Sequence, residues 1–162
     1  MSSPLRDPAE NGFLRLYYRD WRPTRFGMIS NGIWAWASGL GLLPPIVLTL
    51  ETKDIGSGRF NATVLVPVSY QGARYLVSML GDTSRWVQNV RASSGHAFIK
   101  HGRARPVLLT EIPVGARAPV LKAWCQIAIS GRRHLPVAPD APFSAFEAIA
   151  ENYPVFRIDA AN

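Results

Sequence analysis

The spacing of hydrophobic residues changes near residue 45, from a helical to a strand-like pattern. Between residues 26 and 41, apolar side chains recur every three or four positions, which predicts an amphipathic helix. They are Phe26, Ile29, Ile33, Trp36 and Leu40. From Ile46 onward, apolar and polar positions alternate, as in a strand with one buried face. We therefore expect one helix followed by a β-rich region.

Alternating segments bounded by turn residues predict six strands in this region. They are residues 46–52, 63–70, 74–80, 97–101, 106–112 and 154–158. Gln71-Gly72-Ala73 and Gly102-Arg103 mark hairpin turns, and Pro67 suits an edge or a bulge better than a central strand. A helix capped by Asp82 or Thr83 and running to about Ala92 is expected. Further helices are predicted over 116–129 and around 143–149.

Short hairpin-connected strands with helices between them predict a mainly β fold with peripheral helices, of the α+β class, arranged as a small antiparallel barrel. The single strands alternating with long helices that a doubly wound parallel sheet requires are absent from the pattern. Residues 1–25 are polar and rich in arginine and end near Pro23, so we interpret them as an N-terminal arm. The amphipathic helix 26–41 and the barrel then form one domain over 26–162.

The composition excludes several classes of protein. The single Cys125 among 162 residues excludes a disulfide framework and a multi-cysteine zinc site, and its place on an apolar helix stripe predicts a buried, unreactive thiol. No window reaches the roughly 18 apolar residues of a spanning helix, and the N-terminus lacks the features of a signal peptide. A cytoplasmic location is expected, with peripheral membrane contact through helix 26–41 as an alternative to docking on the protein's own core.

The net charge of +7 is unevenly distributed. Residues 85–133 contain nine basic residues and one acidic residue, a local balance of +8. Such asymmetry indicates either an anionic partner or a solvated basic surface. Because the stretch lacks a nucleic-acid-binding motif and interleaved exposed aromatic residues, no nucleic acid is expected among the partners.

Few residues have the spacing of a catalytic or metal site. His96 and His101 lie five apart on one predicted strand, so they face opposite sides, and no metal site is expected. Two segments suit an anion: the glycine-rich turn Lys53–Arg59, and the strand-to-helix junction Ser78–Ser84. Trp86 and Asn89 share a helix face, where they can flank a planar ligand; for Trp86 core packing is the alternative.

From Leu48 to Gly102 the chain resembles the deazaflavin-dependent nitroreductase family, small split β-barrel proteins that bind coenzyme F420. Three features carry the resemblance. Thr52 and Ser57-Gly58 match the family's phosphate loop, Thr63 to Val68 matches the strand that follows, and Tyr75 to Gly81 precedes a helix with tryptophan, asparagine and alanine at the family's spacing (Trp86, Asn89 and Ala92). Asn152 to Ile158 resembles the family's closing strand.

The resemblance implies a split antiparallel β-barrel and an F420H2-dependent oxidoreductase that transfers hydride to an activated alkene, quinone or nitro compound. The implied cofactor contacts are Thr52, Lys53, Ser57, Gly58, Arg59, Thr63, Val64, Leu65, Ser78, Met79, Leu80, Gly81, Trp86, Asn89 and Arg91. Tyr17, Tyr18, Trp34 and Trp36 are expected on the substrate side. Because the cofactor carries the chemistry, no catalytic side chain is expected. Either a monomer or a homodimer is compatible with this picture.

The chain departs from the family in the phosphate loop. Asp54, Ile55 and Gly56 stand where the family has Gly-Arg-Lys, and Asn61 stands at a usually basic position. One hypothesis is that Lys53, Arg59 and Arg91 substitute for the missing cations. The alternative is a divergent or non-catalytic split barrel that binds deazaflavin, FMN or haem.

Overall fold

A computed structural model describes residues 18–19, 22–23, 47–101 and 103–161 of the chain. Its main sheet contains β3 (Leu48–Lys53), β4 (Phe60–Leu65), β5 (Val68–Tyr70), β6 (Ala73–Val77), β7 (His96–His101), β8 (Arg103–Glu111) and β9 (Val155–Ala160). The α-helices in the described part are α3 (Arg85–Ala92), α4 (Arg117–Ile127) and α5 (Phe143–Ile149). Two short strands, β1 (Tyr18–Arg19) and β2 (Arg22–Pro23), pair with each other.

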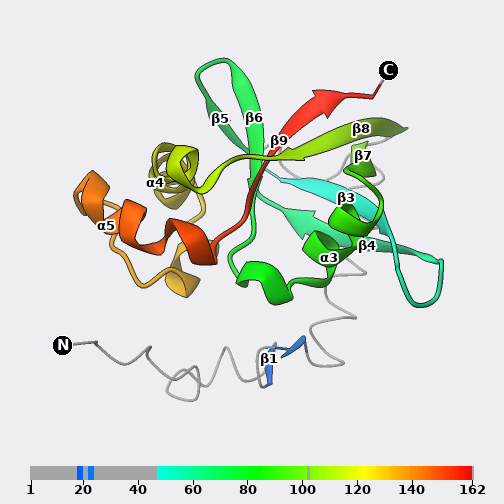
Figure 1. Ribbon diagram of the computed structural model, residues 1–162, viewed down its shortest axis with the longest axis horizontal. Coiled ribbons are helices and arrows are strands. Elements are labelled where there is room, and N and C mark those ends of the chain that lie inside the picture. Colours follow the sequence, from blue (N-terminus) through cyan, green and yellow to red (C-terminus); the bar gives the residue numbers. More distant parts are fainter. Residues whose placement is uncertain (1–17, 20–21, 24–46, 102, 162) are drawn as a thin grey trace.

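The sheet is antiparallel, with the strand order β4-β3-β7-β8-β9-β6-β5. Its two edge strands, β4 and β5, are consecutive in the chain and are separated only by Val66 and Pro67. Six strand spacings in a flat sheet would put these edges about 29 Å apart, whereas the chain from Leu65 to Val68 reaches only about 11 Å. The sheet must therefore curl, as Figure 1 shows. This confirms the predicted mainly β split barrel with peripheral helices.

Four of the predictions for this sheet are wrong in their boundaries. The expected strand 63–70 is two strands, because Pro67 has no N–H to donate to a ladder; β4 and β5 lie on either side of it. The connection between the expected strands 46–52 and 63–70 shrinks to residues 54–59, since β3 and β4 pair as far as Lys53 and Phe60. The strand expected over 74–80 ends at Val77, and β8 begins at Arg103, three residues before the prediction.

The barrel encloses one hydrophobic core, which α3 closes at one end. Inward-facing Leu50, Leu76 and Phe156 pack against Trp86 and its neighbours on this helix. The Trp86 and Phe156 rings meet edge to face, with centroids 5.3 Å apart. Thus α3 positions the predicted cofactor residues while filling the barrel.

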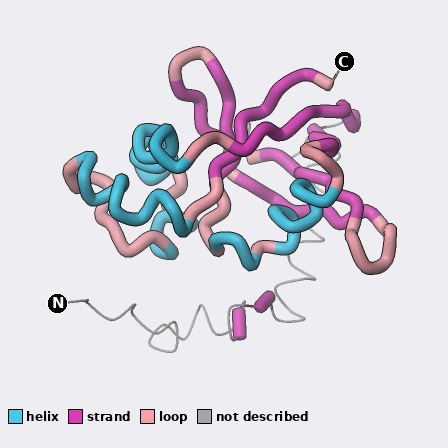
Figure 2. Tube along the Cα trace, in the orientation of Figure 1, coloured by secondary structure: helices cyan, strands magenta, loops and turns pink. Residues whose placement is uncertain are grey.

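A second core lies on the outer face of β6 and β9, beneath α4 and α5. Val77 and Val155 point away from the barrel interior and pack with Leu121, Trp124 and Phe146. Figures 1 and 2 show α4 and α5 together on one side of the molecule, with α3 on the other. Cys125 is fully buried in this core, and burial raises the pKa of its thiol, which confirms the predicted packed cysteine.

The start of α3 differs from the prediction. Asp82 and Thr83 belong to a short 3-10 turn, Gly81–Thr83, and Ser84 is the residue before the helix. Thr83 donates to the Leu80 carbonyl (3.0 Å) instead of capping the helix. The helices predicted over 116–129 and around 143–149 are confirmed as α4 and α5.

Some predictions lie outside the described residues. They include the helix 26–41 and most of the arm 1–25. Among helices in the rest of the chain, none is long and apolar enough to cross a membrane.

Candidate functional site

The β3–β4 loop, where the resemblance expects the cofactor phosphate, folds around the carboxylate of its own Asp54. One carboxylate oxygen accepts hydrogen bonds from the Gly56 amide (3.1 Å), the Ser57 amide (2.8 Å) and the Ser57 hydroxyl (2.9 Å). Glycine-rich loops hold phosphate with just such backbone N–H groups. The carboxylate of Asp54 thus occupies the position of an anion in this loop.

The second carboxylate oxygen of Asp54 faces α3. It accepts from the Asn61 side chain (3.1 Å) and from Nε of Arg85 (2.5 Å). Only 2% of the Asp54 surface remains exposed. The hydrogen bond from Arg85, followed by those from Ser57, holds the pKa of the Asp54 carboxyl well below its usual value. The carboxylate therefore stays ionised and keeps its donors across the physiological pH range.

Asn89 connects α3 to the same loop. Its side-chain amide donates to the Thr52 hydroxyl (3.1 Å), and its carbonyl oxygen accepts from the Ile55 amide (3.3 Å). Asn89 and Thr52 are almost completely buried. The predicted site residues Thr52, Ser57 and Asn89 thus gather around Asp54, and Asn89 has its partners within the chain. Trp86, the other predicted helix residue, is 6% exposed and belongs to the barrel core.

The turn from Ser78 to Gly81, which joins β6 to α3, presents free backbone donors. The Ser78 amide donates to the Pro154 carbonyl and the Gly81 amide to the Ser78 carbonyl. The Ser78 hydroxyl anchors the turn by donating to Gly81 (2.8 Å) and contacting the Ser84 hydroxyl (2.8 Å). Within the described chain, the amides of Met79 and Leu80 have no acceptor.

Gly81 keeps this turn in place through its backbone conformation. Its φ is +70°, and a Cβ there would lie 2.8 Å from the Asn152 carbonyl oxygen. A larger residue would shift the turn or the segment before β9. The two free amides are therefore held in a fixed orientation before any ligand arrives.

The three predicted contacts on β4 do not share one face of the sheet. Thr63 and Leu65 pair with Leu50 and Leu48, whose side chains face the barrel interior. Val64 lies between them and points to the outside, because successive strand residues alternate. A ligand on one face of β4 can therefore contact Val64, or Thr63 and Leu65, but not all three side chains.

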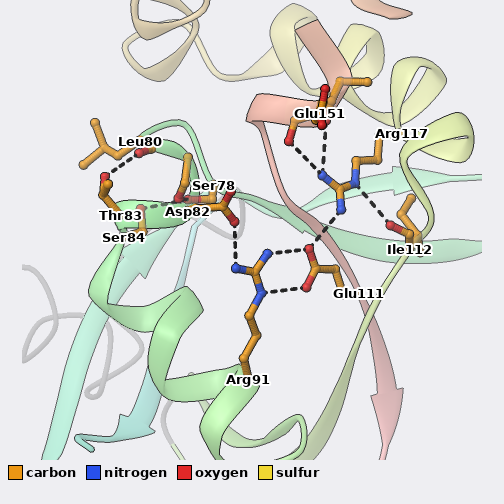
Figure 3. Close-up of polar contacts among 12 residues, drawn as sticks. Ser78, Leu80, Asp82, Thr83, Ser84, Arg91, Glu111, Ile112, Arg117 and Glu151 are labelled. Carbon is orange, nitrogen blue, oxygen red and sulfur yellow. Dashed lines mark hydrogen bonds and ion pairs between the residues drawn. The ribbon is translucent and has the colours of Figure 1, made fainter. Parts of the chain in front are cut away.

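Arg91 has carboxylate partners on another side of α3 (Figure 3). Its guanidinium makes a bidentate contact with Glu111 (2.8 and 2.7 Å) and an ion pair with Asp82 (2.7 Å). Six helical positions separate it from Arg85, about 240° around the axis, so the two arginines serve different surfaces. This placement does not support the hypothesis that Arg91 completes the phosphate loop.

Glu111 also binds Arg117, which extends the same network to the helical side of the molecule (Figure 3). The Arg117 guanidinium donates to Glu111 (2.9 Å) and to the carbonyls of Ile112 (3.1 Å) and Ala150 (3.2 Å). Arg117 is buried. These contacts give two of the basic residues in the +8 stretch a structural role.

The fit to a phosphate-bearing deazaflavin is uneven across this surface. The turn with the Met79 and Leu80 amides suits the polar edge of a planar ring, whereas the β3–β4 loop offers no free donor where Asp54 lies. Lys53, Gly58 and Arg59 are exposed, and within residues 47–101 and 103–161 the two cations have no acidic partner. A phosphate would have to displace Asp54 or bind outside it.

The side chains of the predicted substrate residues are not described by the structure. Tyr17, Trp34 and Trp36 are not among the described residues, and for Tyr18 the structure describes only the backbone in β1. Arg85 is the residue that sequence reasoning missed. Arg85 follows Ser84 at the start of α3. From the sequence it is recognisable only as a charged residue at a helix start, because its partner Asp54 lies 31 positions away.

Comparisons with known proteins support the fold. No family model matches the chain, and no curated protein is similar to it in sequence. A solved protein of unknown function from Agrobacterium tumefaciens is similar with a TM-score of 0.50 at 8% identity, over 80% of this chain and 55% of that chain.

Two further solved structures have lower TM-scores. An F420-H2 dependent reductase is 18% identical over 72% of this chain and 96% of its own, with a TM-score of 0.46. An FAD-binding protein from Mesorhizobium loti is 15% identical over 80% of this chain and 89% of its own, with a TM-score of 0.47. At these TM-scores and identities, neither likeness bears on the activity or the cofactor of this chain.

Proposed function

We propose that this protein binds a planar flavin-type cofactor beside the turn Ser78–Gly81, with coenzyme F420 as the first candidate and FMN as the alternative. The observation that carries the proposal is the pair of unpartnered amides at Met79 and Leu80, held by the Ser78 hydroxyl and Gly81. Flavin and deazaflavin rings carry carbonyl oxygens and ring nitrogens along one edge, and these acceptors match two adjacent N–H donors.

With F420 bound, we propose an F420H2-dependent reductase acting on an activated alkene, quinone or nitro compound. The reduced deazaflavin supplies the hydride, and the chain supplies orientation and a dry surface. Met79 and Leu80 would hold the ring edge, while Ser78 and Gly81 fix the turn. The sequence resemblance from Tyr75 to Ala92 supports this assignment.

The second candidate is a divergent split barrel that binds flavin, deazaflavin or haem without catalysing hydride transfer. The position of Asp54 favours it, because the loop amides that would hold a cofactor phosphate already have an anion of the chain. A ligand without a phosphate in that loop would bind without displacing any group of the protein.

Titration of the purified protein with F420, FMN and haemin, followed by fluorescence or absorbance, tests both candidates. We expect F420 or FMN to bind at micromolar concentration, and Gly81→Ala to weaken this binding. Gly72→Ala is the matched control: its φ is also positive (+79°), but a Cβ there meets nothing within 4 Å. Wild-type binding by Gly81→Ala, or no binding of either cofactor to the wild type, would contradict the proposal.

The Asp54→Gly variant tests whether a cofactor phosphate enters the β3–β4 loop. If a phosphate enters the β3–β4 loop, removal of the carboxylate should tighten F420 binding about tenfold, since the loop amides become free. Binding of riboflavin, which has no phosphate, should not change. Oxidation of F420H2 with a panel of acceptor substrates then distinguishes a reductase from a binding protein.

A further inference from the structure

The barrel end away from α3 forms a cavity of about 370 Å³ that is lined by both apolar side chains and arginines. Its wall includes Leu48, Ile99 and Ile158, and three arginines line it: Arg74, Arg103 and Arg105. We call this end of the barrel the arginine mouth. It shares no residue with the surface assigned above to a flavin-type cofactor.

Strand register explains why these side chains meet. Leu48 lies two residues before Leu50 on β3, and Arg74 two residues before Leu76 on β6, so each points inward like its core neighbour. On β8, Arg105 pairs with inward-facing Ile99, and Arg103 lies on the same face. Leu48 thus belongs to the core at the base of the mouth, and the inward arginines are Arg74 of β6 and Arg103 and Arg105 of β8.

The end of β9 leaves this wall open. β9 pairs with β8 only as far as Ala160 opposite Val107, so Arg103 and Arg105 extend beyond its last residue. Both arginines are exposed. The apolar side chains below and the guanidinium groups above make the mouth amphiphilic.

The three guanidinium groups have no counter-charge from the described part of the chain. Across the described residues, none of them has an ion-pair or hydrogen-bond partner. Other cations of the basic stretch do: Arg85 pairs with Asp54, Arg91 and Arg117 with Glu111. The unevenly distributed charge of the sequence is thus left partly unneutralised at one cavity.

We propose that the arginine mouth binds a small organic anion with an apolar tail and a carboxylate head. Guanidinium groups hold carboxylates through paired N–H donors, and the apolar wall removes a hydrocarbon body from water. The volume lies within the range of small-molecule sites. A bound anion would also offset the electrostatic repulsion among the three arginines.

Calorimetric titration of the full chain with dodecanoate tests the proposal, with dodecan-1-ol and acetate as comparison ligands. Dodecanoate should bind saturably, and dodecan-1-ol at least about tenfold more weakly because it lacks the charge. Acetate should not bind measurably, because it has no apolar body. Equal binding of dodecanoate and dodecan-1-ol, or no binding of dodecanoate, would overturn the proposal.

Variants locate the site. Arg103→Gln and Arg105→Gln should each weaken dodecanoate binding about tenfold, since each removes a charged hydrogen-bond donor at an exposed position. Arg133→Gln, at an exposed arginine in the short helix Gly131–His134, is the control and should leave binding unchanged. If all three variants lose affinity equally, the attraction comes from net charge and the site is refuted. Gly81→Ala should leave dodecanoate binding intact, so the result is independent of the cofactor proposal.

Discussion

The charged side chains described at the two ends of the barrel differ in whether they have partners within the chain. At the α3 end, Asp54 lies within hydrogen-bond reach of five donors and Arg91 faces two carboxylates. At the arginine mouth, three guanidinium groups have no such partner in the described chain. The Asp54 carboxylate and the Arg91 guanidinium already have partners and gain little from an ionic ligand, whereas the three arginines of the mouth are prepared for an anion.

The difference arises from where the acidic residues stand. Asp54 follows β3 directly, so its carboxylate turns back to the amides of its own loop. In β8 the first acidic residue is Glu111, at the end nearest α4, where it forms ion pairs with Arg91 and Arg117. The opposite end of β8 carries Arg103 and Arg105 with no acid between them.

Trp86→Ala should have the largest effect, because it opens the closed end. Trp86 is 6% exposed, and deletion of a buried aromatic side chain typically costs about 3–5 kcal/mol of unfolding free energy. Urea denaturation measures this loss, with Trp86→Phe as the milder control. A loss below about 1 kcal/mol would show that α3 does not close the barrel.

Asn89→Ala should come next, with a loss of about 1–3 kcal/mol. The variant leaves the buried Thr52 hydroxyl and the Ile55 amide without their partner. Gln88→Ala, at the exposed neighbouring position, should change stability by less than about 0.5 kcal/mol. Equal urea midpoints for the two variants would contradict the role of Asn89 as the tie between helix and loop.

Asp54→Asn should change the acid sensitivity of the protein. Since the pKa of the folded Asp54 carboxyl lies below its unfolded value, its stabilisation is present above about pH 4 and is lost as the pH falls further. Urea midpoints between pH 7 and pH 2.5 should therefore fall less steeply in the variant.

Arg85→Gln should reduce the same pH dependence, because Arg85 is the largest cause of the shift. Part of the dependence should remain in both variants, since the hydrogen bond from Arg157 also lowers the pKa of Asp159. A full wild-type pH dependence in both variants would exclude this account of the loop.

The smallest effect is expected at the arginine mouth, and its sign is opposite. The double variant Arg103→Gln/Arg105→Gln relieves like-charge repulsion and should raise stability by a few tenths of a kcal/mol at low salt, about the size of exposed charge interactions. The gain should disappear in 1 M NaCl. Arg91→Gln, which loses two carboxylate partners, should instead lower stability. Destabilisation by the double variant would mean that the mouth has partners among its own residues.

Local patterns predicted most elements of the fold. Period-two alternation located the strands, because their burial pattern repeats with the geometry of one element. The helix predicted over 116–129 is found as α4. Pro67 was predicted to suit an edge or a bulge, but the separation of β4 and β5 at that residue was not predicted. That β4 and β5 lie at opposite edges of the sheet depends on pairing with β3 and β6, which are remote from that proline.

The residues alone were enough to infer the fold class, the buried cysteine, the charge asymmetry and the departure of Asp54 from the pattern of the phosphate loop it resembles. The partners of those charges follow only from the packing of distant elements. Arg85 meets Asp54 across 31 positions, and Arg74 joins Arg103 and Arg105 through strands separated in the chain. The reason is physical: spacing along one element specifies a face, whereas the partner that neutralises a charge is chosen by how distant elements pack.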